Sequence, residues 1–501
     1  MTSHGPILRC LLAVPLAAAI AGCAPSSAPA SGTGQRFGSI DFESCALSTA
    51  GSRPVEAQCA HFEVPEDHDN PDGRRISLSI AVVPSSGLAA PDPVVMIAGG
   101  PGQSALESYP QVAPAFEDVL RRRNVVLVDA RGTGGSNPLR CEDDAGESAF
   151  GSEEASPDAM RAFAARCRDA LSADADLRRY ATMDHVRDLD AVRRALGAPQ
   201  LNLVGISYGT RVAQQYARAY PESTRSLVLD GVVPNSMVLG QEHARNLEQA
   251  LAAQFERCRA EPSCVDALGD PASRLAEVRA TLEAGGLAPV QYRDPTSGEW
   301  LEDTPGFGHL AALLRMFSYQ PAAASTLPLL LHEAAEGRYA PLLAQSRMLT
   351  SSFGDMISHG MQLSVMCTED AAEMAIDPAD ADSVLGNAMV EMLTAQCAAW
   401  PTAERPAGFR DPLQGDLPVL AISGEFDPVT PPRYGDEVVA HLPRGRHLVA
   451  PGQGHNVIGA GCMPKLFAGF VENADASDLD ASCLERLAPP PPFAGLHGWE
   501  P

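Results

Sequence analysis

The segment Gly205-Ile206-Ser207-Tyr208-Gly209 places a serine between two glycines at the spacing that a nucleophile on a tight turn requires. An apolar run, Leu201–Val204, precedes the segment, and helical periodicity follows it as far as Tyr220. A serine on such a strand-to-helix turn stands above the sheet, and the first N–H groups of the helix face the oxyanion of an attacked carbonyl. We therefore expect Ser207 to be a nucleophile and the N–H of Tyr208 to bind the oxyanion.

A serine hydroxyl needs a general base, and two later residues supply a base and an acid. Asp427 and His455 each follow an apolar run, and ligand sites in open α/β sheets collect where strands end. The chain order serine, acid, histidine is that of the triads built on such a turn. We expect His455 to take the proton of Ser207 and Asp427 to orient the imidazole. Glu425, in the same segment as Asp427, is the rival acid.

The glycine-rich segment Gly99-Gly100-Pro101-Gly102 follows another apolar run, Val94–Ala98. A bare backbone at the end of a strand brings an N–H close to a substrate, and each such donor contributes roughly 3–4 kcal/mol to binding of the transition state. Gly100 is the first candidate for the second oxyanion donor, and Gly102 is the alternative.

A second glycine-rich segment, Arg131–Ser136, has some features of a phosphate-binding loop. It has neither the lysine of a P-loop nor the glycine spacing of a dinucleotide site. The cysteines and histidines of the chain show no spacing typical of zinc. We therefore expect a structural loop beside the active site, and we predict neither a cofactor nor a metal.

The elements that position these groups alternate between strands and helices. Several apolar runs are hydrophobic almost throughout, which is typical of parallel strands covered on both faces. The expected strands are Ile76–Val83, Val94–Ala98, Val125–Asp129, Leu201–Gly205, Ser226–Leu229, Leu417–Ser423 and His447–Ala450. The expected helices between them include Asp184–Leu196 and Tyr208–Tyr220. This alternation predicts an α/β fold with a mostly parallel sheet.

Between about Pro234 and Arg405 the strand pattern stops, and helical segments take over. They are Gln241–Arg259, Ala272–Ala284, Phe307–Tyr319 and Ala322–Ala335. A helical block between two strands of one sheet indicates an inserted cap. We predict a first core part at residues 37–234, a mainly helical cap at 235–405, and a second core part at 406–501 that carries the acid and the base.

The N-terminal residues form an export signal rather than part of the fold. The apolar run Leu11–Ala21 is too short to span a bilayer and fits the core of a secretory signal. It ends in Ile20-Ala21-Gly22-Cys23, which resembles a bacterial lipobox. We predict a signal peptide at 1–22, lipid attachment at Cys23 and a flexible tether at 23–36; ordinary cleavage near the end of the run is the alternative. The protein is then an envelope lipoprotein of a bacterium, or a secreted protein.

The cysteine count supports export. Apart from Cys10 and Cys23, ten of the twelve cysteines remain, an even number that suits disulfides in an oxidising compartment. They fall as sequence neighbours, and short loops close most easily. The predicted disulfides join Cys45 to Cys59, Cys141 to Cys167, Cys258 to Cys264, Cys367 to Cys397 and Cys462 to Cys483.

The charge of the chain excludes some classes of partner. The 501 residues include 63 acidic and 37 basic residues, which gives a net charge of −26. Binding of nucleic acid or of anionic lipid needs clustered basic residues. We therefore expect no nucleic-acid partner, contact with a membrane only through the lipid anchor, and a monomer.

Five segments occur together in the order found in one known family. They are Gly99–Gly102, Val128–Gly134, Asp188–Arg193, Gly205–Thr210 and Asp427–Pro431. Over roughly residues 55–485 the sequence resembles the secreted tripeptidyl-aminopeptidase and proline-iminopeptidase branch of the α/β hydrolases. The resemblance implies an α/β-hydrolase fold, a mostly parallel sheet with an inserted helical cap, and peptide substrates. It also implies a serine exopeptidase that releases short peptides or single residues, tripeptides in particular, from free N-termini.

The resemblance also implies roles for individual residues. It assigns the nucleophile to Ser207, the acid to Asp427 and the base to His455, with no cofactor. A carboxylesterase or lipase that uses the same triad is the alternative enzyme. A catalytically silent binding protein is the alternative outside the enzymes.

Members of this family use acidic residues of the cap to hold the α-ammonium group of the substrate. Glu369 is the candidate that the resemblance implies, and a solvated acidic pair formed with Asp370 is the alternative. Proline iminopeptidases have a histidine directly before the Gly-Gly-Pro-Gly run, whereas Ala98 stands there in this chain. This difference favours the tripeptidyl branch.

Overall fold

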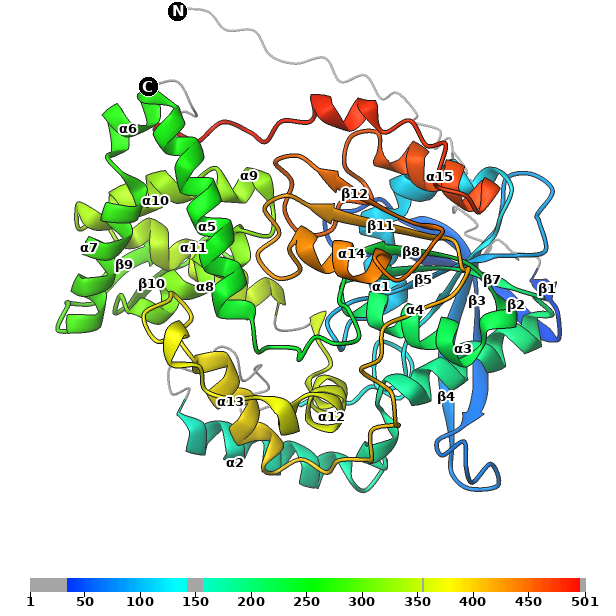
Figure 1. Ribbon diagram of the computed structural model, residues 1–501. Coiled ribbons are helices and arrows are strands. Elements are labelled where there is room, and N and C mark those ends of the chain that lie inside the picture. Colours follow the sequence, from blue (N-terminus) through cyan, green and yellow to red (C-terminus); the bar gives the residue numbers. More distant parts are fainter. Residues whose placement is uncertain (1–33, 142–155, 354–355, 496–501) are drawn as a thin grey trace, which may run out of the picture. The chain divides into compact units, whose positions relative to one another are not determined.

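The computed structural model describes residues 34–141, 156–353 and 356–495 (Figure 1). Its main sheet has ten strands. They are β1 (Gln35–Phe37), β2 (Ile40–Leu47), β3 (Val55–Pro65), β4 (Arg75–Val83), β5 (Val94–Ile97), β6 (Val125–Val128), β7 (Leu201–Ile206), β8 (Thr224–Asp230), β11 (Val419–Gly424) and β12 (Gly445–Ala450). Their order is β1-β2-β3-β4-β6-β5-β7-β8-β11-β12. The six strands from β6 to β12 in this order pair in parallel, and β1 to β4 form an antiparallel edge.

The seven strands predicted from apolar runs are all present, as β4 to β8, β11 and β12. Every residue of β5, β6 and β7 is buried, which explains their continuous hydrophobicity. The strands β1, β2 and β3 were not predicted. In β2 buried and exposed residues mostly alternate, so this edge strand has polar side chains that interrupt an apolar run. Gln35 and Arg36 belong to β1 and pair with β2. The tether predicted at 23–36 therefore extends too far, by these two residues.

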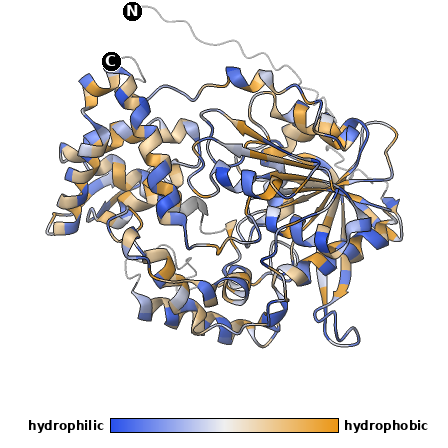
Figure 2. Cartoon of the chain, viewed as in Figure 1, coloured by the Kyte–Doolittle hydropathy of each residue, from blue (hydrophilic) through white to orange (hydrophobic). Residues whose placement is uncertain are grey.

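Helices cover both faces of the sheet. Helices α3 (Thr182–Leu196), α4 (Tyr208–Ala219) and α14 (Pro432–Val439) cover one face, and α1 (Ala105–Val112) and α15 (Met463–Asn473) cover the other. Side chains of a strand alternate between the two cores: Val95 and Ile97 join the first, and Val94 and Met96 join the second. Figure 2 shows the result, hydrophobic central strands between helices of mixed hydropathy.

A long helical insertion separates β8 from β11, where the sequence predicts the cap. Its helices are α5 (His243–Ala260), α6 (Pro262–Leu268), α7 (Pro271–Ala284), α8 (Phe307–Phe317), α9 (Pro321–Ala324), α10 (Leu327–Ala335), α11 (Ala340–Phe353), α12 (His359–Glu369) and α13 (Ala388–Cys397). A small hairpin of β9 (Val290–Arg293) and β10 (Trp300–Asp303), which was not predicted, lies between α7 and α8. The segment predicted as one helix at Ala322–Ala335 is two helices, because Pro328 in the first turn of α10 cannot continue a helix from α9.

The insertion packs in two ways. Helices α5, α7, α8, α10 and α11 share a hydrophobic core of their own, which contains Leu251, Leu314 and Leu331. Helices α12 and α13 instead pack against α2 (Pro157–Leu171), a helix from the first core part, around Phe163, Leu363 and Trp400. The end of the cap is therefore attached to the core, and only its first part is an independent packing unit.

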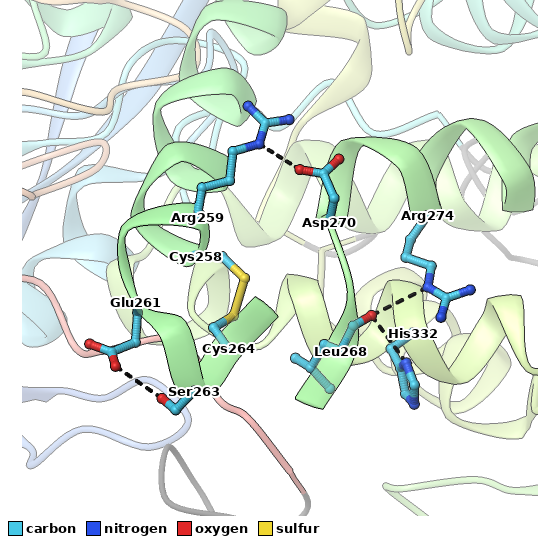
Figure 3. Close-up of a disulfide and its surroundings, with 9 residues drawn as sticks. All are labelled: Cys258, Arg259, Glu261, Ser263, Cys264, Leu268, Asp270, Arg274 and His332. Carbon is cyan, nitrogen blue, oxygen red and sulfur yellow. Dashed lines mark hydrogen bonds and ion pairs between the residues drawn. A yellow bond between two sulfur atoms is a disulfide. The ribbon is translucent and has the colours of Figure 1, made fainter. Parts of the chain in front are cut away.

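All five predicted disulfides are present in the structure. They join Cys45 to Cys59, Cys141 to Cys167, Cys258 to Cys264, Cys367 to Cys397 and Cys462 to Cys483. Figure 3 shows the shortest loop, in which Cys258 at the end of α5 is bonded to Cys264 in α6. Nearby, Arg259 pairs with Asp270, so the α5–α6–α7 corner is held by a covalent and an ionic link. These disulfides fit an oxidising compartment.

The N-terminal predictions fall outside the described residues. The signal peptide at 1–22 and the lipid attachment at Cys23 belong to residues 1–33, which the structure does not describe. Within the described ranges, no helix combines the length and the hydrophobicity needed to cross a membrane.

A buried ion pair connects the loop after β6 to α3. Arg131 binds Asp188 through two hydrogen bonds of 2.6 and 2.7 Å, and both side chains are fully buried. The guanidinium also donates to the carbonyls of Glu66 and Arg179, and His68 contacts Asp188 at 2.8 Å. The glycine-rich loop that begins at Arg131 is therefore structural, as predicted from its composition.

We predict that Arg131→Met lowers the free energy of unfolding by about 3–5 kcal/mol, because it leaves Asp188 charged and buried without its main partner. Denaturant unfolding measures the loss. Arg178→Met is the matched control, because Arg178 forms an exposed pair with Asp176 at 2.8 Å and this pair is expected to contribute only about 0–1 kcal/mol. Equal losses for the two variants would contradict a structural role for the buried pair.

Candidate active site

Ser207 occupies the sharp turn between β7 and α4. Its backbone has φ +54° and ψ −122°, a conformation that non-glycine residues rarely adopt. The flanking glycines are required by space: a Cβ on Gly205 would collide with the carbonyl of Gly209, and a Cβ on Gly209 would collide with the carbonyl of Ile97. The structure thus builds the nucleophile turn that the sequence predicts.

Asp427 and His455 meet beyond the ends of β11 and β12. The Asp427 Oδ2 to His455 Nδ1 distance is 2.7 Å, and both side chains are buried. Asp427 also accepts from the N–H groups of Val429 and Thr430 and from the Thr430 hydroxyl. Burial alone would lower the pKa of His455, but Asp427 outweighs it and holds that pKa above its ordinary value. Burial alone would raise the pKa of Asp427. His455 and the hydrogen bonds stabilise the ionised form more strongly, so this pKa is lowered.

Asp230, at the end of β8, connects the nucleophile turn with the histidine loop. Its carbonyl accepts from the N–H of Ser207 at 2.8 Å. Its buried carboxylate accepts from the N–H groups of Val457 and Ile458, just after the catalytic histidine. Burial raises the pKa of Asp230 to about 6, against these hydrogen bonds. Sequence reasoning missed this residue, although a single acid at the end of a hydrophobic strand is a usable signal.

The loop after β5 lies against the nucleophile. A Cβ on Gly99 would lie 3.1 Å from the Ser207 Cβ, so this position must stay small. Gly100 and Gly102 have φ +102° and +106°, which favour glycine. Asp129 holds this loop in place. Its carboxylate accepts from the Ser104 hydroxyl at 2.6 Å and from the backbone N–H groups of Leu106 and Gly135. The contact of Gly99 with Ser207 places this loop beside the nucleophile turn. The oxyanion donors at Gly100 and Tyr208 stay a prediction.

The rival residues have other partners. Glu425 is exposed and accepts from the N–H of Gly452 at 2.7 Å, whereas Asp427 binds the histidine. His447 lies between Asp436 and the Ser423 hydroxyl, at 2.8 and 2.9 Å, and is structural.

The surroundings of Glu369 do not support its predicted role as the ligand of a substrate ammonium group. Only 3% of the residue is exposed, and its carboxylate accepts from the N–H and the hydroxyl of Thr182 at 2.7 and 2.9 Å. Burial raises the pKa of Glu369 to about 7, although Arg211 opposes the rise. A carboxyl group that is buried and already bonded to Thr182 is not open to a substrate ammonium group. We correct the prediction accordingly.

Asp370 is equally occupied, so the alternative of a solvated acidic pair does not agree with the structure either. Its carboxylate lies 3.1 Å from Arg211 and 2.8 Å from Arg410. Arg211 belongs to α4, directly behind the nucleophile, and Asp370 follows α12 of the cap. Together with Glu369, these charges attach the end of the cap to the nucleophile helix.

The cap also touches His455, the predicted general base. The carbonyl of Tyr319, just after α8, accepts from the N–H of His455 at 2.8 Å. The Tyr319 ring packs edge-on against the imidazole, with ring centroids 5.1 Å apart. Sequence reasoning had no signal for this contact, because a backbone carbonyl is present at every residue.

Comparisons with known proteins agree with this geometry. A family model described as the alpha/beta hydrolase fold matches residues 92–459. Serine protease Hip1 of Mycobacterium tuberculosis is 26% identical over 471 residues, which cover 86% of this chain and 88% of that protein. Tripeptidyl aminopeptidase of Streptomyces lividans is 25% identical over 486 residues, which cover 90% and 88%. Carboxylesterase B of Mycobacterium tuberculosis is 27% identical over 283 residues, which cover 53% and 54%.

Solved structures are similar at lower identity. A proline iminopeptidase from Mycobacterium smegmatis is 18% identical with a TM-score of 0.38, covering 83% of this chain and 97% of that chain. A thermophilic esterase from Thermogutta terrifontis is 14% identical with a TM-score of 0.37, covering 83% and 97%.

We predict that kcat/KM falls as the pH drops through the raised pKa of His455, with a midpoint above the ordinary histidine value of about 6.5. The imidazole must be neutral to accept the serine proton, so acid removes the base. Asp427→Asn removes the charge that raises this pKa; the midpoint should shift to lower pH, and kcat should fall by about 10³- to 10⁴-fold. Pre-steady-state and steady-state pH profiles measure both effects.

Glu425→Gln is the matched control for Asp427→Asn, because it removes a carboxylate from the same loop. It should leave the midpoint where it is in the wild type. A shift with Glu425→Gln and none with Asp427→Asn would reverse the assignment of the acid.

Proposed function

Because this chain belongs to the α/β-hydrolase family, we propose that it is a serine peptidase that releases short peptides, tripeptides in particular, from free N-termini. The observation that carries the proposal is the position of Ser207, Asp427 and His455 after β7, β11 and β12, on one edge of the sheet. Two relatives that align over most of the chain support it, because they are a serine protease and a tripeptidyl aminopeptidase.

In the proposed reaction, Ser207 attacks the scissile carbonyl while His455 accepts its proton. Asp427 holds the imidazole tautomer and stabilises the imidazolium that forms. The N–H groups of Tyr208 and Gly100 bind the oxyanion. His455 then protonates the leaving amine, and a water molecule hydrolyses the acyl-enzyme.

The contact between the cap and His455 supports cleavage near a chain end. The segment after α8 lies on the catalytic histidine, so the cap borders the position of the substrate directly. A substrate that enters beneath such a cap by one end is favoured over a folded protein.

A carboxylesterase is the second candidate, and one observation favours it. Carboxylesterase B is 27% identical, although over 53% of this chain only. An ester needs the same triad and oxyanion donors but no site for an ammonium group. The state of the substrate N-terminus therefore separates the two functions.

We predict that peptidyl anilides with a free N-terminus have a kcat/KM at least about 10-fold higher than their N-acetylated forms. Acetylation removes a charge-assisted hydrogen bond of roughly 1.5–3 kcal/mol. Chromogenic release gives the rates, and mass spectrometry gives the length of the released peptide.

Ser207→Ala is the control for serine chemistry, because it should lower turnover of every substrate by more than about 10³-fold. Near-normal turnover in this variant would exclude Ser207 as the nucleophile. Equal rates on free and acetylated peptides, or activity on short acyl esters alone, would replace the peptidase with the esterase.

We also propose that the protein is exported and attached to a bacterial envelope membrane through Cys23. Cys23→Ser should move the protein from the membrane fraction to the soluble fraction, and intact mass of the wild type should show an acylated N-terminal cysteine. Cys10→Ser is the control, because Cys10 lies in the part that is removed. A mature chain without lipid would leave a secreted protein.

A further inference from the structure

Arg315 lies in the last turn of α8, just before the cap segment that touches the catalytic histidine. Tyr319, four residues later, packs on the imidazole of His455. The guanidinium of Arg315 interacts with the Tyr319 side chain; burial raises the pKa of this phenol, and Arg315 opposes the rise. Tyr319 thus links Arg315 to the histidine of the triad.

Arg315 has no acidic partner within the described part of the chain. No carboxylate there forms an ion pair with it, and the side chain is only partly exposed. A cationic group at such a position usually has a counter-charge, because partial burial weakens its hydration. None of the described residues supplies one.

A second polar group in this region lacks a hydrogen-bond partner. His243, in the first turn of α5, has a buried Nδ1 without a hydrogen-bond partner among the described residues. Burial first, and then the charge of Arg315, lower the pKa of His243 to about 3, so the ring is neutral near pH 7. Asn246, in the same part of α5, donates to the carbonyl of Val429 at 2.7 Å, so the start of this helix lies against the loop that carries Asp427.

We propose that Arg315, together with Tyr319 and His243, forms a subsite for a carboxylate on the leaving-group side of the scissile bond. His455 delivers the proton to the leaving amine, so groups packed beside its ring border the leaving residue. An arginine binds a carboxylate through parallel N–H donors, and a phenol and a neutral imidazole add further hydrogen bonds.

The subsite adds a substrate class to the proposed function, on which it rests. The preferred substrates have a carboxylate on the residue after the cleaved bond. This carboxylate is either the α-carboxylate of a leaving residue at the C-terminus or the side chain of an acidic leaving residue. Both present the same planar anion to Arg315.

The test measures kcat/KM for four peptides of the form Ala-Ala-Ala-X. In the first pair X is glycine or glycinamide, and in the second pair X is aspartic acid α-amide or asparagine α-amide. The wild type should prefer the carboxylate member of one pair by about 10- to 100-fold, the effect of a charge-assisted hydrogen bond. The first pair reports an α-carboxylate and the second a side chain. Arg315→Gln should reduce this ratio to near one.

Arg293→Gln is the matched control for charge. Arg293 lies in the cap hairpin, stacks on Trp300 and contacts a backbone carbonyl rather than the triad. This variant should keep the wild-type ratio. A wild type without preference in either pair would overturn the subsite, as would a preference that survives in Arg315→Gln. Equal losses on all four peptides would mean that Arg315 only positions Tyr319 and His455, and would also overturn it.

Two further sets of substrates separate this proposal from the peptidase proposal. If N-acetylated forms of the four peptides are cleaved as fast as the free forms, the exopeptidase function fails while the ratios still report on Arg315. If only esters are cleaved, acyl esters of glycolate and glycolamide give the same readout, because they differ only in the carboxylate of the leaving group.

Discussion

Asp230 holds the two halves of the active site in register. Its carbonyl binds the N–H of Ser207, and its carboxylate binds two N–H groups directly after His455. The nucleophile turn and the histidine loop are more than 200 residues apart in the chain, so local structure alone cannot set their distance. One buried acid at the end of β8, a strand between them, does so, through its main-chain carbonyl on one side and its side-chain carboxylate on the other. The strain at Ser207 is tolerated because these surroundings determine it.

Buried charges attach the cap to this frame. Arg211, on the helix that begins at the nucleophile turn, meets Asp370 at the end of α12, and Arg410 closes the cluster from the second core part. Burying such charges is costly unless each is paired, and here each acid has a partner. The arrangement therefore favours one placement of the cap's end over others of similar packing. The first part of the cap, with its own hydrophobic core, lacks such a cluster with α4 in the described contacts.

Features that depend on local sequence context could be predicted, and features that depend on tertiary contact could not. The central strands are visible as apolar runs because both of their faces are covered, whereas β2 alternates and was missed. The positions of Ser207, Asp427 and His455 follow from the strands before them. Glu369 shows the limit: an acid in the cap has the same sequence whether it faces a substrate or is buried against Thr182. Only its environment decides between the two.

The hydrogen bond from His455 to the carbonyl of Tyr319 has a consequence for the catalytic cycle. If α8 moves away to admit a substrate or release a product, the histidine loses this acceptor and the ring packed on it. Asp427 would still hold the imidazole in such a form, but the backbone of the histidine loop would lack its bond to the cap. Any movement of α8 is therefore coupled to the placement of the general base.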